Sequence, residues 1–161
     1  MTNELSNDEL KELVHKLSWN DGFGCYTRAG FEQLVWPMIR DRARWILYFD
    51  LDNIHALNES FGSYEPVDRM VKQVLSTVRS TDYVAGQYKS GDEFLVCITE
   101  SDARGTLNPE GMQERLIVEL AKHGISATFA IVPVTSLDLA TNVKPAVDMV
   151  YAVKKQRGGS R

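Results

Sequence analysis

The spacing of apolar and polar positions along the chain predicts a mixture of helices and strands. A first helix is expected in SNDELKELVHKL, where Ser6 and Glu9 form a capping box. Its apolar face consists of Leu10, Leu13, Val14 and Leu17. A stripe this short more often packs on its own domain than on a partner, although it could also form the seam of a dimer.

The middle of the chain continues this alternation. A Gly-rich turn, WNDGFGCY, precedes a second helix, TRAGFEQLVWPMIRD, which Thr27 caps and Pro37 kinks or ends. The run RWILYFDL predicts a buried strand, and DNIHALNESFG predicts a short helix or turn that Gly62 closes. EPVDRMVKQVLSTVRS predicts a longer helix with Pro66 near its first turn.

The second half of the chain predicts a β-hairpin, a helix, a strand and a last helix. DYVAGQY and EFLVCIT are apolar runs joined by KSGD, so the acids stand at the hairpin tip. The loop ESDARGTL leads to the helix NPEGMQERLIVELAKHG, capped by Asn108 and stopped by Gly124. The strand ISATFAIVPV precedes a final helix from near Asn142 to about Gln156.

The order of these elements indicates one α/β domain with a central, mostly antiparallel sheet flanked by helices. The N-terminal helix or leader is assigned to residues 1–18 and the domain to residues 19–161. A chain of 161 residues is long enough for one compact core.

Charge and composition narrow the classes of partner. A net charge of −4 and a pI of about 5.4 argue against the broad basic face that a nucleic-acid backbone requires. The acidic start, MTNELSNDEL, is no signal peptide, and no apolar run approaches the roughly 20 residues that span a bilayer. Cys25 and Cys97 form no CxxC pair, which fits a reducing compartment. We therefore expect a cytoplasmic protein without nucleic-acid or membrane partners, and Met1 favours a short stand-alone chain.

Two acidic clusters stand at the ends of predicted strands. YFDLD places Asp50 and Asp52 two residues apart, and GDE places Asp92 and Glu93 on a hairpin tip 42 residues after Asp50. If these strands are neighbours, Asp50 and Asp92 converge, and two carboxylates are the usual protein share of a Mg²⁺ site. SGDE is equally a good polar turn, so the acids alone leave both interpretations open.

Four motifs, taken together, resemble the GGDEF domain of the diguanylate cyclase family. SGDEF, residues 90–94, is similar to the family signature. FDLDNIHALNESFG matches the family's D-x-D-x-F-K-x-x-N-D-x-x-G frame at Asp50, Asp52, Asn58 and Gly62. NDGFGCYTRAGF resembles the opening motif at Gly24, Arg28 and Phe31, and YAVKKQRGG resembles the tail motif at Tyr151 and Lys154. The resemblance covers about residues 18–160.

The resemblance implies a palm-like sheet of the nucleotidyl cyclase type, GTP as substrate and cyclic di-GMP as product. It implies two Mg²⁺ or Mn²⁺ ions per active site and a homodimer in which two bound triphosphates face each other. The implied metal ligands are Asp50, Asp92 and the carbonyl of Leu51. Glu93 is implied as a catalytic residue that activates the 3′-hydroxyl or assists the metal.

The resemblance also implies a set of substrate-binding residues: Ile54, His55, Asn58, Asp68, Ser90, Gly91 and Lys154. Ser90, Gly91 and Lys154 would contact phosphates, and Asn58 would contact the edge of the base.

Several positions depart from the family pattern. Ser90 replaces the first signature glycine, and His55 replaces a phosphate-binding lysine. Counted from Gly62, the guanine-binding aspartate falls on Val67, so that Asp68 comes one residue late, about 100° round a helix. This weakens the case for guanine, leaves adenine open, and predicts that Val67→Asp raises the use of GTP. Arg157 precedes the tail glycines instead of following one.

Arg79 and Asp82, in RSTD, match the inhibitory R-x-x-D pattern of the family. They lie two residues further from the signature than is usual. Because R-x-x-D is also an ordinary sequence at a helix end, we favour a structural role.

Three functions remain open from the sequence. The first is a diguanylate cyclase with its acids intact. The second is a stand-alone synthase resembling the CRISPR polymerase, which uses ATP or mixed purines; Val67 and the lack of a sensory domain favour it. The third is a degenerate module that binds GTP or a cyclic dinucleotide without turnover, favoured by Val67, His55 and Ser90. Base specificity, product linkage and input signal are not fixed by the sequence.

Overall fold

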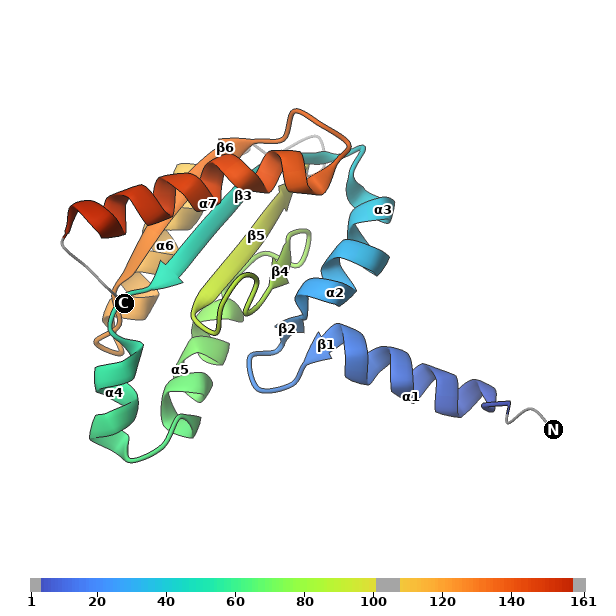
Figure 1. The fold of residues 1–161 in the computed structure, drawn as a ribbon, viewed down its shortest axis with the longest axis horizontal. Helices are drawn as coiled ribbons and strands as arrows, with labels where there is room; N and C mark the ends of the chain where they lie inside the picture. Colours follow the sequence, from blue (N-terminus) through green and yellow to red (C-terminus); the bar gives the residue numbers. More distant parts are fainter. Residues whose placement is uncertain (1–3, 101–107, 158–161) are drawn as a thin grey trace.

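The computed structural model describes residues 4–100 and 108–157, and its centre is a six-stranded sheet in the order β1-β2-β4-β5-β3-β6 (Figure 1). The longest strand, β3 (Ala43–Leu51), pairs antiparallel with β5 (Glu93–Thr99) and with β6 (Ala127–Pro133). Antiparallel pairing also joins β4 (Tyr83–Ala85) to β5, whereas β2 and β4 are parallel. The expected α/β class with a mostly antiparallel sheet is confirmed.

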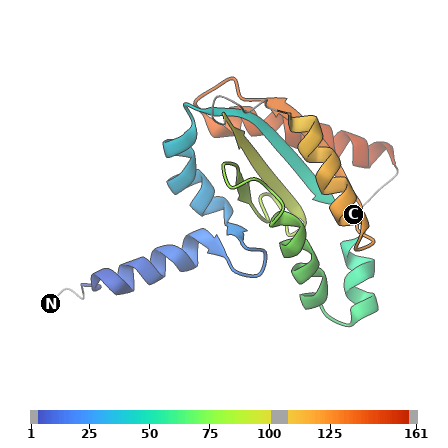
Figure 2. The same ribbon diagram turned by 180° about the vertical axis from the view of Figure 1, so that it is seen from behind.

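Helices cover both faces of this sheet. One face is covered by α7 (Leu139–Gln156) together with α3 (Trp36–Ile39), and the other by α5 (Glu65–Leu75) and α6 (Pro109–Ala121), which lie in front of the sheet in Figure 2. The side chains of β3 alternate between the two cores, since a strand has a period of two residues. Tyr48 therefore packs on the α7 side and Phe49 on the α5–α6 side.

Helix boundaries follow the capping residues that the sequence indicates. Ser6, Thr27 and Asn108 each accept a hydrogen bond from the backbone N–H three residues on, at 3.1, 3.0 and 2.9 Å. Gly62 ends α4 (Ile54–Phe61) with φ of +76°, and Gly124 follows α6 with φ of +72°. A left-handed residue is favourable there only for glycine, which lacks a Cβ atom.

The second predicted helix continues through its proline. It consists of α2 (Arg28–Gly30), a π-helical turn (Phe31–Val35) and α3, with Pro37 in the first turn of α3. A π-helical turn directly before Pro37 accommodates the missing backbone N–H without ending the helix.

Three expectations about the elements are wrong. The Gly-rich turn contains two short strands, β1 (Trp19–Asn20) and β2 (Cys25–Tyr26), that extend the sheet. The connection between β4 and β5 is longer than KSGD and runs over residues 86–92. The last helix begins at Leu139, because Asp138 caps it by accepting from the Thr141 N–H at 3.1 Å. The predicted loop at residues 101–107 and the tail glycines lie outside the described residues.

The N-terminal helix α1 (Asn7–Ser18) extends away from the sheet (Figure 1). Its apolar stripe is exposed, by 45% at Leu10, 42% at Leu13, 48% at Val14 and 62% at Leu17. The expectation that this stripe packs on its own domain is therefore wrong. No helix of residues 4–100 and 108–157 is long and apolar enough to cross a membrane.

The Arg79–Asp82 pair fixes the turn after α5 to the sheet. Two guanidinium nitrogens of Arg79 donate to the carboxylate of Asp82 at 2.8 and 3.0 Å, and the Thr99 N–H donates to the same carboxylate at 3.1 Å. The Asp82 side chain is wholly buried. These contacts support the structural role that we favoured for this pair over an inhibitory site.

We expect Asp82→Ala to lower the free energy of unfolding by about 3 kcal/mol, because it leaves the Arg79 guanidinium and a backbone donor without their acceptor. Glu100→Ala is the matched control, since it breaks an exposed ion pair with Arg44 and costs less than about 1 kcal/mol. Urea unfolding of both variants measures the difference. Equal losses in the free energy of unfolding would show that the buried Arg79–Asp82 pair stabilises the fold no more than the exposed Arg44–Glu100 pair does.

Candidate functional site

The register of three strands brings polar residues to one end of the sheet. Asp50, near the end of β3, lies opposite Glu93 of β5 and opposite Thr128 of β6. Residues directly opposite in a sheet place their side chains on the same face, and here that face is covered by α7. The sequence placed Asp50 near the hairpin acids, but the acid directly across the ladder is Glu93, not Asp92.

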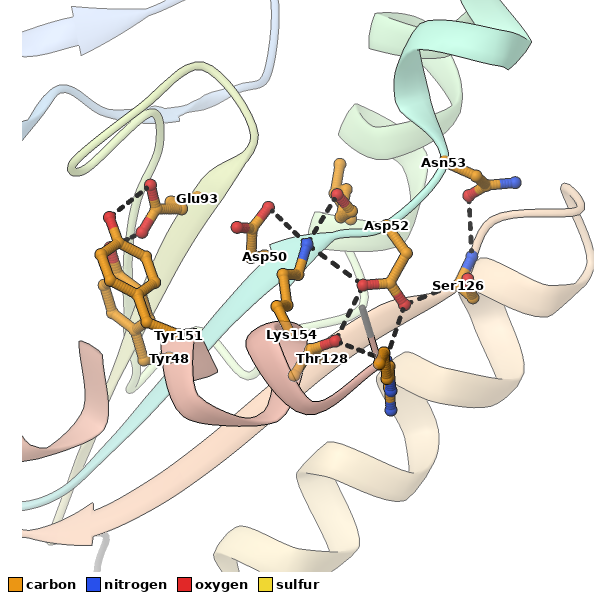
Figure 3. Close-up of polar contacts among 11 residues, drawn as sticks. Tyr48, Asp50, Asp52, Asn53, Glu93, Ser126, Thr128, Tyr151 and Lys154 are labelled. Atoms are coloured by element: carbon orange, nitrogen blue, oxygen red, sulfur yellow. Dashed lines mark hydrogen bonds and ion pairs between the residues drawn. The ribbon is translucent and has the colours of Figure 1, made fainter. Parts of the chain in front are cut away.

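Glu93 is buried and held by two tyrosines. Its carboxylate accepts from the Tyr48 hydroxyl at 2.7 Å and from the Tyr151 hydroxyl at 3.4 Å (Figure 3). Burial raises the pKa of Tyr48 far above its ordinary value, and the hydrogen bond to Glu93 adds to this, so the phenol stays a neutral donor. The expectation that Glu93 stands at the hairpin tip is wrong, because it is the first residue of β5, where its side chain is buried.

The ammonium group of Lys154 lies among the oxygens at the end of β3. Its Nζ atom is 3.1 Å from Asp50 Oδ1, 3.1 Å from Asp52 Oδ1 and 3.3 Å from the Leu51 carbonyl oxygen (Figure 3). The Asp50 side chain is fully buried, and that of Lys154 is 14% exposed. A buried carboxylate requires a positive partner, and the last turn of α7 supplies one.

Asp52 has further partners that the sequence did not indicate. It accepts hydrogen bonds from the Thr128 hydroxyl at 2.8 Å and the Ser126 hydroxyl at 3.2 Å. Arg157 lies 3.6 Å from Asp52 and also donates to the Thr128 hydroxyl at 2.8 Å. Ser126 and Thr128 come from the β6 segment, so only the pairing of β6 with β3 could have identified them. In the sequence, Arg157 stands out only because it precedes the tail glycines, and this position does not connect it with Asp52.

A cleft of about 450 Å³ opens on the other side of this strand end. Five residues expected to bind substrate or metal line it: Ile54, Asn58, Asp68, Gly91 and Asp92. Phe23 and Tyr64 are among the residues that complete the wall. A Cβ atom built on Gly91 would come within 3.8 Å of the Gln87 amide nitrogen, an ordinary contact, so this part of the wall is uncrowded.

Two residues of the cleft wall, Asn58 and Asp68, carry hydrogen-bond acceptors. The side-chain oxygen of Asn58 is buried and has no hydrogen-bond partner among the described residues. Burial raises the pKa of the Asp68 carboxyl, and the negative charges of Asp92 and Glu65 raise it further. A buried acceptor without a donor is costly, so this wall favours a ligand that presents N–H groups.

Val67 lies in the core and does not face the cleft. It is 1% exposed and packs with the apolar residues of α5 and α6, whereas its neighbour Asp68 lines the cleft. The position expected from the count for the guanine-binding carboxylate therefore lies in the core, and the carboxylate on the cleft wall is that of Asp68. Val67→Asp would bury its new carboxylate among apolar side chains, so the position of Val67 does not support the expectation that this change raises the use of GTP.

Other expected residues lie apart from the cleft. His55 is exposed in the first turn of α4 and is not among the lining residues. Ser90 also does not line the cleft; its carbonyl accepts from the Glu93 N–H at 3.2 Å and shapes the turn before β5.

The atoms expected to hold a metal are carboxylate and carbonyl oxygens, the ligands that Mg²⁺ and Mn²⁺ prefer. Among the described residues, no three side chains of His, Cys, Asp or Glu converge on one point. The Leu51 N–H donates to the Asp92 carbonyl at 2.9 Å, so the expected ligands Leu51 and Asp92 are direct neighbours across the strand end. Asp50 and the Leu51 carbonyl already contact one cation, the Lys154 ammonium. Two carboxylates and a carbonyl fit Mg²⁺ or Mn²⁺ if phosphate oxygens and waters complete the coordination.

The opening motif braces the loop between β4 and β5. Arg28 donates to the Tyr88 carbonyl at 3.2 Å, and its guanidinium lies 4.8 Å from the centre of the Tyr88 ring. The Tyr88 N–H in turn donates to the Glu93 carbonyl at 2.8 Å. Arg28 therefore positions the loop that carries Gly91 and does not line the cleft itself.

The comparison with solved structures identifies the fold. A microbial GGDEF domain described with cyclic di-GMP superposes with a TM-score of 0.67 at 17% identity, covering 87% of this chain and 94% of that one. The coiled coil and GGDEF domain of DgcB from Caulobacter crescentus, in complex with c-di-GMP, gives a TM-score of 0.68 at 15% identity, covering 94% and 87%. The GGDEF domain of TpbB (YfiN) from Pseudomonas aeruginosa gives 0.65 at 20% identity, covering 86% and 89%.

No model of a known protein family matches the chain, and no curated protein matches it in sequence. The superpositions on the solved structures nevertheless show that the chain has the fold of GGDEF domains.

We expect Val67→Asp to lower the free energy of unfolding by about 3 kcal/mol or more, because it places a charge in the apolar core. The matched control is Asp68→Val, which changes the neighbouring residue on the cleft wall and costs less than about 1 kcal/mol. Urea unfolding measures both. A Val67→Asp variant as stable as the parent protein would show that position 67 faces the cleft after all.

Proposed function

We propose that this chain is a nucleotidyltransferase of the diguanylate cyclase type, which condenses two GTP molecules to cyclic di-GMP. The observation that carries the proposal is the cleft wall formed by Asn58 and Asp68, beside the acids of the GGDEF-like strand end. The fold that it shares with GGDEF domains supports the same class of reaction.

The cleft wall favours guanine over adenine. Guanine presents the N1–H and N2–H₂ donors side by side, and the two carboxylate oxygens of Asp68 on the cleft wall are acceptors for such a pair of donors, with Asn58 beside them. Adenine presents one amine donor beside an acceptor nitrogen, which leaves one of these acceptors without a partner. The main support for the synthase that uses ATP or mixed purines was Val67, and that residue lies in the core.

The remaining residues take roles around the reacting phosphates. Asp50, the Leu51 carbonyl and Asp92 would hold Mg²⁺ or Mn²⁺, two ions per site, which supply charge neutralisation and an activated 3′-hydroxyl. Gly91 would let phosphate groups approach the loop backbone, and Lys154 would supply a positive charge from the last turn of α7. Glu93 stands behind Asp50, where Tyr48 and Tyr151 fix its carboxylate.

Turnover requires two copies of the chain, because each site binds one triphosphate and two must attack each other. The exposed apolar stripe of α1 would pack against the same helix of a second copy. Three of its residues, Leu10, Leu13 and Leu17, follow the spacing of a coiled-coil seam. The homodimer is therefore part of the proposal.

A second candidate is a module that binds a nucleotide without turnover. Lys154 favours it, because its ammonium contacts the carboxylate and carbonyl oxygens that a metal would use. Ser90 and His55, which replace family residues, favour it as well.

We expect purified protein with Mg²⁺ or Mn²⁺ to convert GTP to cyclic di-GMP, and Asp50→Asn or Asp92→Asn to reduce turnover by about a hundredfold or more. Asparagine is chosen because it keeps the shape of the Asp50 side chain, which is buried against Lys154. Mass spectrometry of products from each of the four nucleoside triphosphates, singly and mixed, measures this. Asp148→Asn, which alters an exposed carboxylate on α7, is the control with unchanged turnover.

Two outcomes contradict the proposal. An adenine-containing product as the main species would identify the alternative synthase. Retained binding of GTP with no product from any triphosphate would identify the module without turnover.

A further inference from the structure

The Lys154 ammonium lies where the expected metal ligands meet. Of its three oxygen contacts, two are to atoms assigned to the metal, Asp50 Oδ1 at 3.1 Å and the Leu51 carbonyl at 3.3 Å. Figure 3 shows the side chain reaching across from the end of α7 to the end of β3. These oxygens serve one cation at a time, because a divalent ion bound there would repel the ammonium group at close range.

We propose that Lys154 is an internal cation that excludes the metal from Asp50 until the phosphates of a nucleotide draw its ammonium away. Metal binding to this chain is then conditional on nucleotide binding. The inference rests on the proposed function in one respect: nucleotide phosphates and metal share this site.

Burial explains why a cation stays at Asp50 at all times. The carboxylate has no exposed surface, so water cannot stabilise its charge. Lys154 provides that charge from within the chain, and a divalent ion would provide it when bound. If the ammonium and the divalent ion exchange, Asp50 always has a cation beside it, and the free-energy cost of an unpaired buried carboxylate does not arise.

The neighbouring contacts allow Lys154 to leave. Asp52, its other carboxylate partner, keeps the hydroxyl groups of Ser126 and Thr128 and the guanidinium of Arg157 when the ammonium moves. Asp50 is thus the acid that the departure makes available for a metal.

The chemistry of lysine suits such a movement. Its ammonium is a compact charge at the end of four flexible methylene groups, and it binds phosphate oxygens as readily as carboxylate oxygens. A triphosphate in the adjoining cleft offers several anionic oxygens, whereas free Mg²⁺ or Mn²⁺ offers the ammonium no new partner. Nucleotide therefore releases Lys154, and metal alone does not.

Titration with Mn²⁺, followed by electron paramagnetic resonance without nucleotide, tests the exclusion. We expect Lys154→Gln to bind Mn²⁺ about tenfold or more tightly than the parent protein. Lys155→Gln, which removes the same charge from the exposed neighbouring residue of α7, should bind Mn²⁺ like the parent. If Lys154→Gln binds Mn²⁺ no more tightly than Lys155→Gln, the inference is wrong.

Thermal unfolding shows whether the variant folds. We expect Lys154→Gln to have a lower Tm than the parent in EDTA and to regain most of the loss with Mn²⁺, because the ion replaces the missing charge at Asp50. A Tm of the Lys154→Gln variant that Mn²⁺ does not change would contradict the inference.

Nuclear magnetic resonance of the lysine side chains tests the release in the parent protein, even if the variant is unstable. The Lys154 signal should shift with a non-hydrolysable GTP analogue in EDTA and stay unchanged with Mg²⁺ alone. A shift with Mg²⁺ alone, or none with the analogue, would overturn the inference.

Failure of the inference and failure of the proposed function are distinguishable. A protein that makes cyclic di-GMP while Lys154→Gln leaves Mn²⁺ affinity unchanged refutes the inference alone. A protein that makes no product, but shows tighter Mn²⁺ binding by Lys154→Gln and release of Lys154 by the analogue, supports the inference and refutes the cyclase.

Discussion

The buried carboxylate of Asp50 is the constraint on which the site depends. It sits on β3 at a point where β5 and β6 both pair with that strand, so its position is fixed from both sides. Because it has no access to water, the chain must bring a cation to it, and the last turn of α7 does so with Lys154. The helix α7 therefore has two roles: it packs on one face of the sheet, and its last turn supplies the positive charge that Asp50 requires.

The end of β3 separates two kinds of chemistry. On the α7 side lie charges and hydroxyl groups that neutralise one another around Asp50 and Asp52. The cleft on the other side is lined by Asn58 and by the carboxylate-bearing Asp68. The Leu51 carbonyl and Asp92 connect the two sides across the strand end. A nucleotide with its base in the cleft would bring its phosphates to this junction, which is the geometry that a nucleotidyl transfer needs.

Much of the fold was predictable from local signals, whereas details of the site were not. Caps such as Ser6 and the stop at Gly62 act within a few residues, so the sequence displays them directly. The phase of α5 depends on where that helix starts, and with its start at Glu65 the helix turns Val67 into the core and Asp68 to the cleft. The burial of Glu93 depends on the pairing of β5 with β3 and on the hydroxyls of Tyr48 and Tyr151, and the partners of Lys154 depend on packing between residues more than a hundred positions apart.

The most direct test of this account is a crystal structure of the protein with a non-hydrolysable GTP analogue and Mg²⁺. The account predicts guanine against Asn58 and Asp68, a metal ion bound by Asp50 and the Leu51 carbonyl, and the Lys154 ammonium on the phosphates. A structure with metal and nucleotide bound elsewhere, or with the Lys154 ammonium still on Asp50 beside a bound nucleotide, would contradict it.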